Sequence, residues 1–227
     1  MNRKWITIIV VALVVGAGIA YGIFALQSTG SPPPASLSET DDEPTASVDT
    51  DDTEGKWTVV ATDSFVGYRV REKLAFLPAP ADAVGRTSTV EGTMTISGTT
   101  VEEGTITADL RDLESDESRR DQTIRTTGLE SDTFPEAIFE LNSPIELDTK
   151  PKPGSVVKTT VEGTLTIHGQ TNDVEIPIEA RLSTNGIEVA GSLEILFADY
   201  GISPPSVGPA TVEDHGTMEF QVLFVPA

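Results

Sequence analysis

The sequence predicts an all-β domain of about eight short antiparallel strands. From Lys56 onwards, apolar and polar residues alternate in one stretch after another, with the period of two that is typical of a strand with one buried face. Turn residues separate these stretches, and the Asn185-Gly186 pair is a strong hairpin signal. Both a β-sandwich and a β-barrel fit this pattern, and periodicity alone does not separate them.

The clearest strand pair lies at residues 161–182. Residues 161–167 and 174–182 each alternate between apolar and polar side chains, on either side of a polar turn at 169–172. Two such runs around a short turn predict a β-hairpin with one apolar and one wet face. Pro177 has no N–H to donate to a ladder, so we expect it at a sheet edge or a bulge.

Six further stretches have the same period. They are 57–61, 64–70, 90–96, 137–141, 193–197 and 218–224. Gly92 and Gly163 fall inside predicted strands, where a missing side chain leaves space for a ligand or lets the wall curve.

Two stretches do not follow this alternation of apolar and polar residues. Residues 74–82 form an apolar loop after the second predicted strand, which either plugs one end of the domain or forms a lip around a ligand entrance. Residues 114–129 are polar and predict a short helix, capped by Ser115 or Asp116. We expect the charged residues of this helix to form a solvated face rather than a headgroup site.

Four groups of residues follow one another in the order of a known family. They are Trp57-Thr58-Val59 with Ser64-x-Val66-x-Tyr68-x-Val70; Arg120-Asp121, Leu129-Glu130 and Phe134-Pro135-x-x-x-Phe139; Leu165-Thr166-Ile167-His168-Gly169 with Val174-x-Ile176-x-Ile178; and Asp199-Tyr200-Gly201-Ile202. Together they span about 57–225, and the chain resembles the YceI-like family of polyisoprenoid-binding proteins. One departure is Gln122, which stands where many members have a histidine.

This resemblance implies an eight-stranded antiparallel, lipocalin-like β-barrel with a short helical insertion, and an isoprenoid chain threaded through an apolar tunnel. Burying each CH₂ group contributes ~0.8 kcal/mol, so a few isoprene units give a substantial driving force. The candidate tunnel residues are Tyr68, Val70, Leu74, Phe76, Phe139, Leu165, Ile167, Ile195, Phe197 and Phe220. For each of them, ordinary core packing is the alternative interpretation.

The composition disfavours several other functions. A formal net charge of −21 disfavours nucleic acid as a partner, because phosphate binding needs clustered Lys and Arg. The chain has no Cys, which excludes disulfides and thiol catalysis. We expect His168 to make turn or barrel-end hydrogen bonds and His215 to lie in a turn, with no metal or cofactor. No catalytic motif occurs and no carboxylate pair stands out, so we predict that the protein is not an enzyme.

The N-terminus predicts a membrane anchor. Residues 5–26 are almost wholly apolar, and about 22 residues suffice to cross a ~30 Å hydrocarbon core. Arg3 and Lys4 precede this run and no basic residue follows until Lys56, which predicts a cytoplasmic N-terminus. A cleaved signal peptide is the alternative, although its apolar core is typically about 7–15 residues.

Three parts are therefore predicted. Residues 1–26 form a transmembrane signal anchor, 27–55 a disordered acidic linker rich in Pro, Ser and Thr, and 56–227 the barrel domain. We expect a single-pass protein of the cell membrane, whose extracytoplasmic barrel carries or sequesters a polyisoprenoid or similar amphiphilic lipid. The alternatives are an interaction or envelope-stress module with a filled barrel and, third, a hydrolase that uses carboxylates. A homodimer is left open.

Overall fold

The computed structural model describes residues 31–38, 53–74, 80–204 and 210–227. The chain divides into two compact units, residues 1–33 and 34–227, and every strand within the described residues belongs to the second. The predicted span at 5–26 and most of the predicted linker lie outside the described residues. Within the ranges given above, no helix is both long enough and apolar enough to cross a bilayer.

The domain is built of antiparallel strands and a few short helical turns. The strands are β1 (Gly55–Val59), β2 (Phe65–Leu74), β3 (Ala81–Thr87), β4 (Val90–Ser97), β5 (Thr100–Asp109), β6 (Glu114–Ser115), β7 (Glu136–Leu141), β8 (Ile145–Glu146), β9 (Val156–Ile167), β10 (Gln170–Ser183), β11 (Gly186–Leu196), β12 (Ala210–Val212) and β13 (His215–Pro226). The helical pieces are η1 (Ala61–Asp63), η2 (Leu110–Asp112), α2 (Ser118–Thr123), η3 (Ile124–Gly128) and η4 (Phe197–Tyr200).

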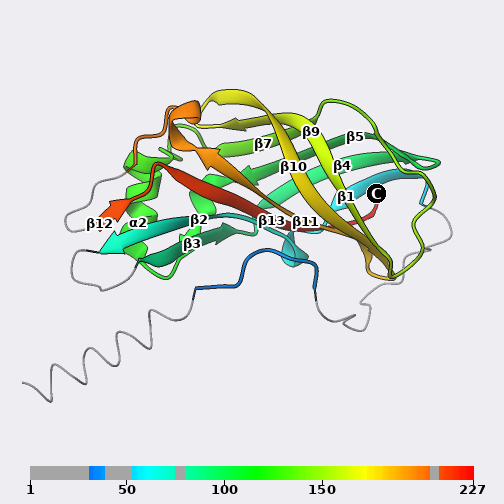
Figure 1. Ribbon diagram of the computed structural model, residues 1–227, viewed down its shortest axis with the longest axis horizontal. Coiled ribbons are helices and arrows are strands. Elements are labelled where there is room, and N and C mark those ends of the chain that lie inside the picture. Colours follow the sequence, from blue (N-terminus) through cyan, green and yellow to red (C-terminus); the bar gives the residue numbers. More distant parts are fainter. Residues whose placement is uncertain (1–30, 39–52, 75–79, 205–209) are drawn as a thin grey trace, which may run out of the picture. The chain divides into compact units, whose positions relative to one another are not determined.

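Eight strands close into a barrel, in the order β1-β4-β5-β7-β9-β10-β11-β13 and back to β1 (Figure 1). The closing pair joins Trp57 to Pro226 and Val59 to Phe224. The first half of β13 pairs instead with β2, which continues to β3 and β6. The expectation of an eight-stranded barrel is therefore confirmed, and a sandwich is excluded.

The membership of the ring differs from the prediction in one place. The predicted strand at 64–70 lies in β2, beside the ring, and β5 takes the eighth position. A register shift in β5 concealed this strand, because Ile96 pairs with Val101 whereas Thr95 pairs with Glu103. The extra residue changes which alternate positions face inward, so no single period of two runs through β5.

The 161–182 hairpin is present, but its turn is tighter than predicted. His168 and Gly169 alone form the turn, with φ of 52° and 71°, and Gln170 already pairs with Ile167. Two consecutive positive φ angles match the hairpin turn whose twist suits the flanking strands. Pro177 lies just beyond the β10–β11 pairing, which starts at Ile178, and this agrees with the expected edge position.

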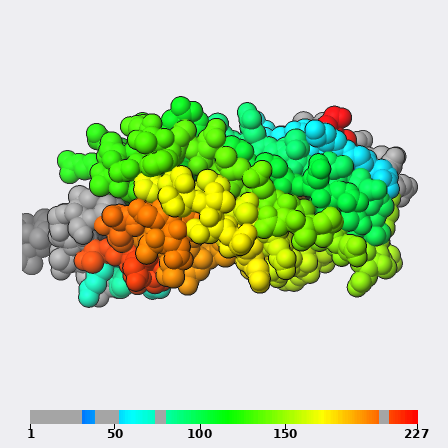
Figure 2. Space-filling model, turned by 90° about the horizontal axis from the view of Figure 1, so that it is seen from above, coloured from blue at the N-terminus to red at the C-terminus, as the bar shows by residue number. Residues whose placement is uncertain are grey.

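The barrel has two different ends. At one end, here called the helical end, lie α2, η3 and η4, which Figure 2 shows as green and orange surfaces gathered away from cyan β1. The other end, here called the turn end, carries the β4–β5 turn, residues 147–155 and the β10–β11 turn. The α2 helix is capped by Glu117, whose side chain accepts a hydrogen bond from the Arg119 N–H, and not by Ser115 or Asp116 as predicted.

Candidate functional site: an apolar cavity in the barrel

A cavity of about 200 Å³ lies inside the barrel. Seven of the eight ring strands supply its wall, and the lining side chains are almost all apolar. Representative lining residues are Met94, Ile106, Phe139, Leu165, Ile178, Val189 and Phe220. A dry cavity of about 150 Å³ lined by such side chains is known to hold benzene, so this one is large enough for apolar groups.

The cavity opens at the turn end. Gly98 lines it and is exposed, while the lining residues Thr99, Leu147 and Pro151 are half-buried. No described residue of α2, η3 or η4 lines the cavity. The opposite half of the interior is filled by the core, where Ile167 and Tyr200 are buried. The described residues therefore place the cavity toward the turn end of the barrel, and the continuous tunnel stays a prediction.

Among the described residues, none directs a charge into the cavity. Apart from four threonines, Arg181 is the only polar residue among those that line it. Its guanidinium lies on the outer wall, where Nη2 donates to Glu188 Oε2 at 2.8 Å. Glu188 points outward because its neighbours Ile187 and Val189 line the cavity. Such a site can hold an uncharged apolar group, and it offers no ligands for a metal.

The predicted tunnel residues divide into three groups. Phe139, Leu165 and Phe220 line the cavity. Tyr68, Val70, Ile167, Ile195 and Phe197 do not line it: Ile167 belongs to the buried core, and Tyr68, Ile195 and Phe197 pack against that core. Phe76 and the side chain of Leu74 lie outside the described residues, so their predicted role as a lip stays a prediction.

Two of these residues depart further from the expectation. Phe197 was predicted as the end of a strand, but β11 ends at Leu196 and Phe197 begins η4. Phe197 and Val70 both lie close to Gly216, on the helical side of the interior. A period of two predicts that a side chain points inward, but it does not give its height along the barrel.

The small residues that leave the cavity open were not among the predicted site residues. Ala108 and Ala137 are Cα partners on β5 and β7, and with Gly104 and Ala180 they line the cavity. Small residues at inward positions of the predicted strands 137–141 and 174–182 were the available signal. The strand glycines do not leave space for a ligand, because Phe139 occupies the space beside Gly163 and Val59 lies against Gly92. The alternative, that they let the wall curve, stays a prediction.

Comparison with known proteins gives the family. The model of the YceI-like domain matches residues 57–224. This chain belongs to the YceI-like family. No curated protein matches it significantly.

Two solved structures have a similar fold. A polyisoprenoid-binding domain from Saccharophagus degradans, implicated in plant cell wall breakdown, is 17% identical with a TM-score of 0.58, over 74% of this chain and 97% of that one. BcnA from Burkholderia cenocepacia is 16% identical with a TM-score of 0.56, over 74% and 99%. At these identities the likeness establishes the barrel fold.

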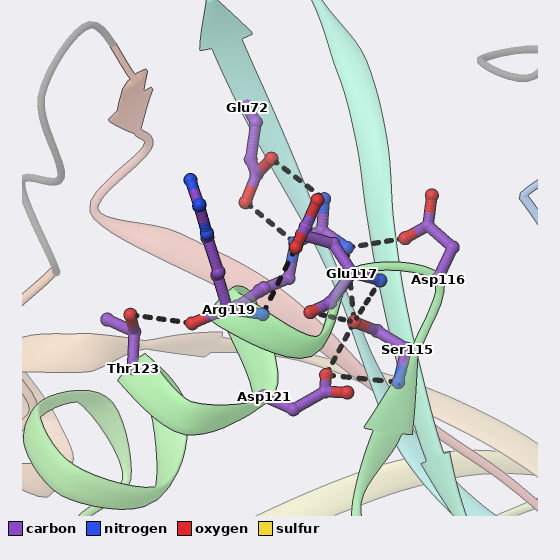
Figure 3. Close-up of polar contacts among 8 residues, drawn as sticks. Glu72, Ser115, Asp116, Glu117, Arg119, Asp121 and Thr123 are labelled. Carbon is purple, nitrogen blue, oxygen red and sulfur yellow. Dashed lines mark hydrogen bonds and ion pairs between the residues drawn. The ribbon is translucent and has the colours of Figure 1, made fainter.

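Arg120 and Asp121, from the motif that resembles the YceI-like family, fasten α2 to β2 and β6. Figure 3 shows Asp121 beside Ser115. Arg120 Nε and Nη2 donate to the two carboxylate oxygens of Glu72 on β2, at 3.1 and 3.2 Å. The Asp121 carboxylate accepts from the N–H and the hydroxyl of Ser115, at 3.1 and 2.5 Å. The predicted solvated face is correct for Arg119, which is exposed, but wrong for Arg120, whose side chain is largely buried.

The two histidines lie at the helical end and do not line the cavity. His168 Nδ1 is 3.0 Å from the Tyr200 carbonyl and Nε2 is 3.3 Å from Glu130 Oε2, which confirms the predicted barrel-end hydrogen bonding. His215 begins β13 rather than lying in a turn, and it contacts Asp214 at 2.9 Å. Among the described residues, no three potential metal ligands come together.

Proposed function

We propose that this YceI-like protein binds one end of a polyisoprenoid or similar long-chain lipid in the barrel cavity, as a carrier or a sequestering protein. The observation that carries the proposal is the apolar cavity, which reaches the turn end and whose described lining residues direct no charge inward. The Saccharophagus domain, described as polyisoprenoid-binding, supports it through the shared fold.

The volume of the cavity limits how much of the ligand it can hold. Because about 150 Å³ accommodates a six-carbon ring, about 200 Å³ accommodates a segment of about one to two isoprene units. The polar headgroup and the rest of the chain stay at the mouth, since burying an unpaired polar group among these side chains is costly. An open cavity also disfavours the alternative of an interaction module with a filled barrel.

The proposal includes the membrane anchor. Residues 5–26 span the cytoplasmic membrane, and the charges of Arg3 and Lys4 keep the N-terminus inside, so that the barrel stands outside. A tethered barrel remains close to the bilayer that contains its lipid. We propose binding without catalysis, because no ionisable side chain of the described residues faces the bound segment.

A matched pair of substitutions tests lipid binding. Val189 and Val174 are both half-buried and packed against the core, but only Val189 lines the cavity. In the full-length protein, Val189→Phe should fill the space of about two to three CH₂ groups and weaken a fluorescent polyprenyl analogue about tenfold or more. Val174→Phe should leave the affinity within about threefold.

Thermal melts accompany both titrations, because overpacking alone costs ~1–3 kcal/mol. The proposal is rejected if both variants fold and bind the analogue as tightly as the parent. Native mass spectrometry of protein purified from its own membranes is a second test. We expect it to detect a lipid that co-purifies with the protein.

A further inference from the structure

The outer wall of the barrel holds a piece of the predicted linker. Ser38 donates from its N–H and from its hydroxyl to Glu188 Oε1, at 2.8 and 2.6 Å. The Ser38 carbonyl accepts from Arg181 Nη2 at 2.9 Å. Both backbone polar groups and the side chain of Ser38 are therefore bonded to the barrel, although it lies some 150 residues earlier in the chain.

Three neighbouring strands build this contact. Arg181 comes from β10 and Glu188 from β11, and Gln221 of β13 donates from Nε2 to Ser38 Oγ at 3.1 Å and to Glu188 Oε1 at 2.9 Å. Glu188 is buried although it lies on the outer face, and a buried carboxylate is stable only when it is fully paired. We call the contact of Ser38 with these three residues the Ser38 latch.

The docked segment differs in composition from its surroundings. Residues 34–38 carry no charge, and Ala35 and Leu37 are half-buried, whereas Glu39, Asp41 and Asp42 follow at once. Within the Ser38 latch, the positive charge of Arg181 is already balanced by Glu188. The Ser38 latch therefore favours an uncharged segment, and its Glu188 carboxylate would repel the acidic run.

The Ser38 latch lies beside the mouth of the cavity. Arg181 and Glu188 are Cα partners close to the β10–β11 turn, and their neighbours Leu182 and Ile187 line the cavity from the inner side of the same wall. The linker is thus fastened to the turn end of the barrel, where the cavity opens.

We propose that the Ser38 latch is a docking site for the protein's own linker, and that it shortens the free tether between the barrel and the predicted anchor. The chain enters β1 at the turn end in either case, since Gly55 pairs with Ile96 beside the β4–β5 turn. This inference rests on the anchor of the proposed function. With the latch closed, the tether between residues 26 and 38 reaches at most about 40 Å. Without it, the chain from 26 to 56 reaches about 100 Å. A closed latch therefore shortens the greatest distance that the tether allows between the barrel and the bilayer, and an open latch lengthens it.

Distance measurements test the latch directly. Because the chain has no Cys, Ser36→Cys and Glu194→Cys introduce one spin label on the docked segment and one on the outer face of β11. In the full-length protein in lipid nanodiscs, double electron–electron resonance should give one narrow distance. Ser38→Asp, which places a second carboxylate against Glu188, should broaden the distribution about twofold or more.

Glu179→Gln is the control, since Glu179 is on the outer face of β10 and its ion-pair partner among the described residues is exposed Lys158. It should leave the distribution narrow. A broad distribution in the parent, or a narrow one in the folded Ser38→Asp variant, overturns the latch. A broad distance distribution in the parent protein rejects the latch and leaves the proposed function standing. A narrow distribution in a protein that does not bind the polyprenyl analogue rejects the proposed function and leaves the latch standing.

Discussion

The ring of Phe139 on β7 occupies the space that a side chain at Gly163 on β9 would take. A Cβ added to Gly163 would lie 2.3 Å from Phe139 Cε2 and 2.5 Å from the Glu140 carbonyl oxygen. Phe139 also lines the cavity. The pair therefore connects a glycine in the barrel wall to the shape of the binding site.

Gly163→Ala should destabilise the domain by ~1–3 kcal/mol, because the new methyl group overlaps the ring and the backbone. Urea denaturation measures this loss. Gly104→Ala is the control, since its nearest neighbour would be Leu141 Cβ at 3.8 Å, an ordinary contact. Adding Phe139→Leu should recover part of the stability of Gly163→Ala, and additivity of the two losses would contradict the proposed overlap.

Arg120→Ala should destabilise the domain by about 3 kcal/mol, because it leaves the largely buried carboxylate of Glu72 without this ion-pair partner. Binding of the polyprenyl analogue should remain within about threefold at a temperature where the variant is folded, since the helical end does not line the cavity. Arg119→Ala, on the exposed side of the same helix, should cost less than about 0.5 kcal/mol. A folded Arg120→Ala protein that no longer binds the analogue would instead place the headgroup at α2.

Alkaline pH should destabilise the barrel. Burial raises the pKa of Tyr68, and burial also raises the pKa of Tyr200. Above pH 10 or so, the unfolded chain loses these protons while the folded state retains them, so stability that is present below that pH falls as the pH rises.

Tyr68→Phe should make this decline shallower, and Tyr68→Phe with Tyr200→Phe shallower still. Free energies of unfolding at several pH values between about 8 and 11 measure the slope. If the double variant loses stability as steeply as the parent, the two tyrosines are not its cause.

The pattern of the sequence did not predict the contacts of Ser38 or of Arg120. Ser38 lies in a segment whose composition predicted disorder, and its partners come from three strands at the far end of the sequence. Arg120 lies in a polar run that predicted a solvated helix, yet it is largely buried against β2. In both cases a polar residue is ordered by partners that only the folded chain brings together.

The sequence by itself determined the all-β class and the inward positions of most strands, because a pleated strand places alternate side chains on opposite faces. Its motifs indicated the YceI-like barrel. The tertiary structure decided where the interior is empty. Phe139, Leu165 and Phe220 line the cavity, whereas Ile167, Ile195 and Phe197 pack in or against the core, although all were predicted to point inward. Periodicity gives the direction of a side chain, but its height in the barrel follows from strand register, and register depends on pairing between distant segments and on local shifts such as the one in β5.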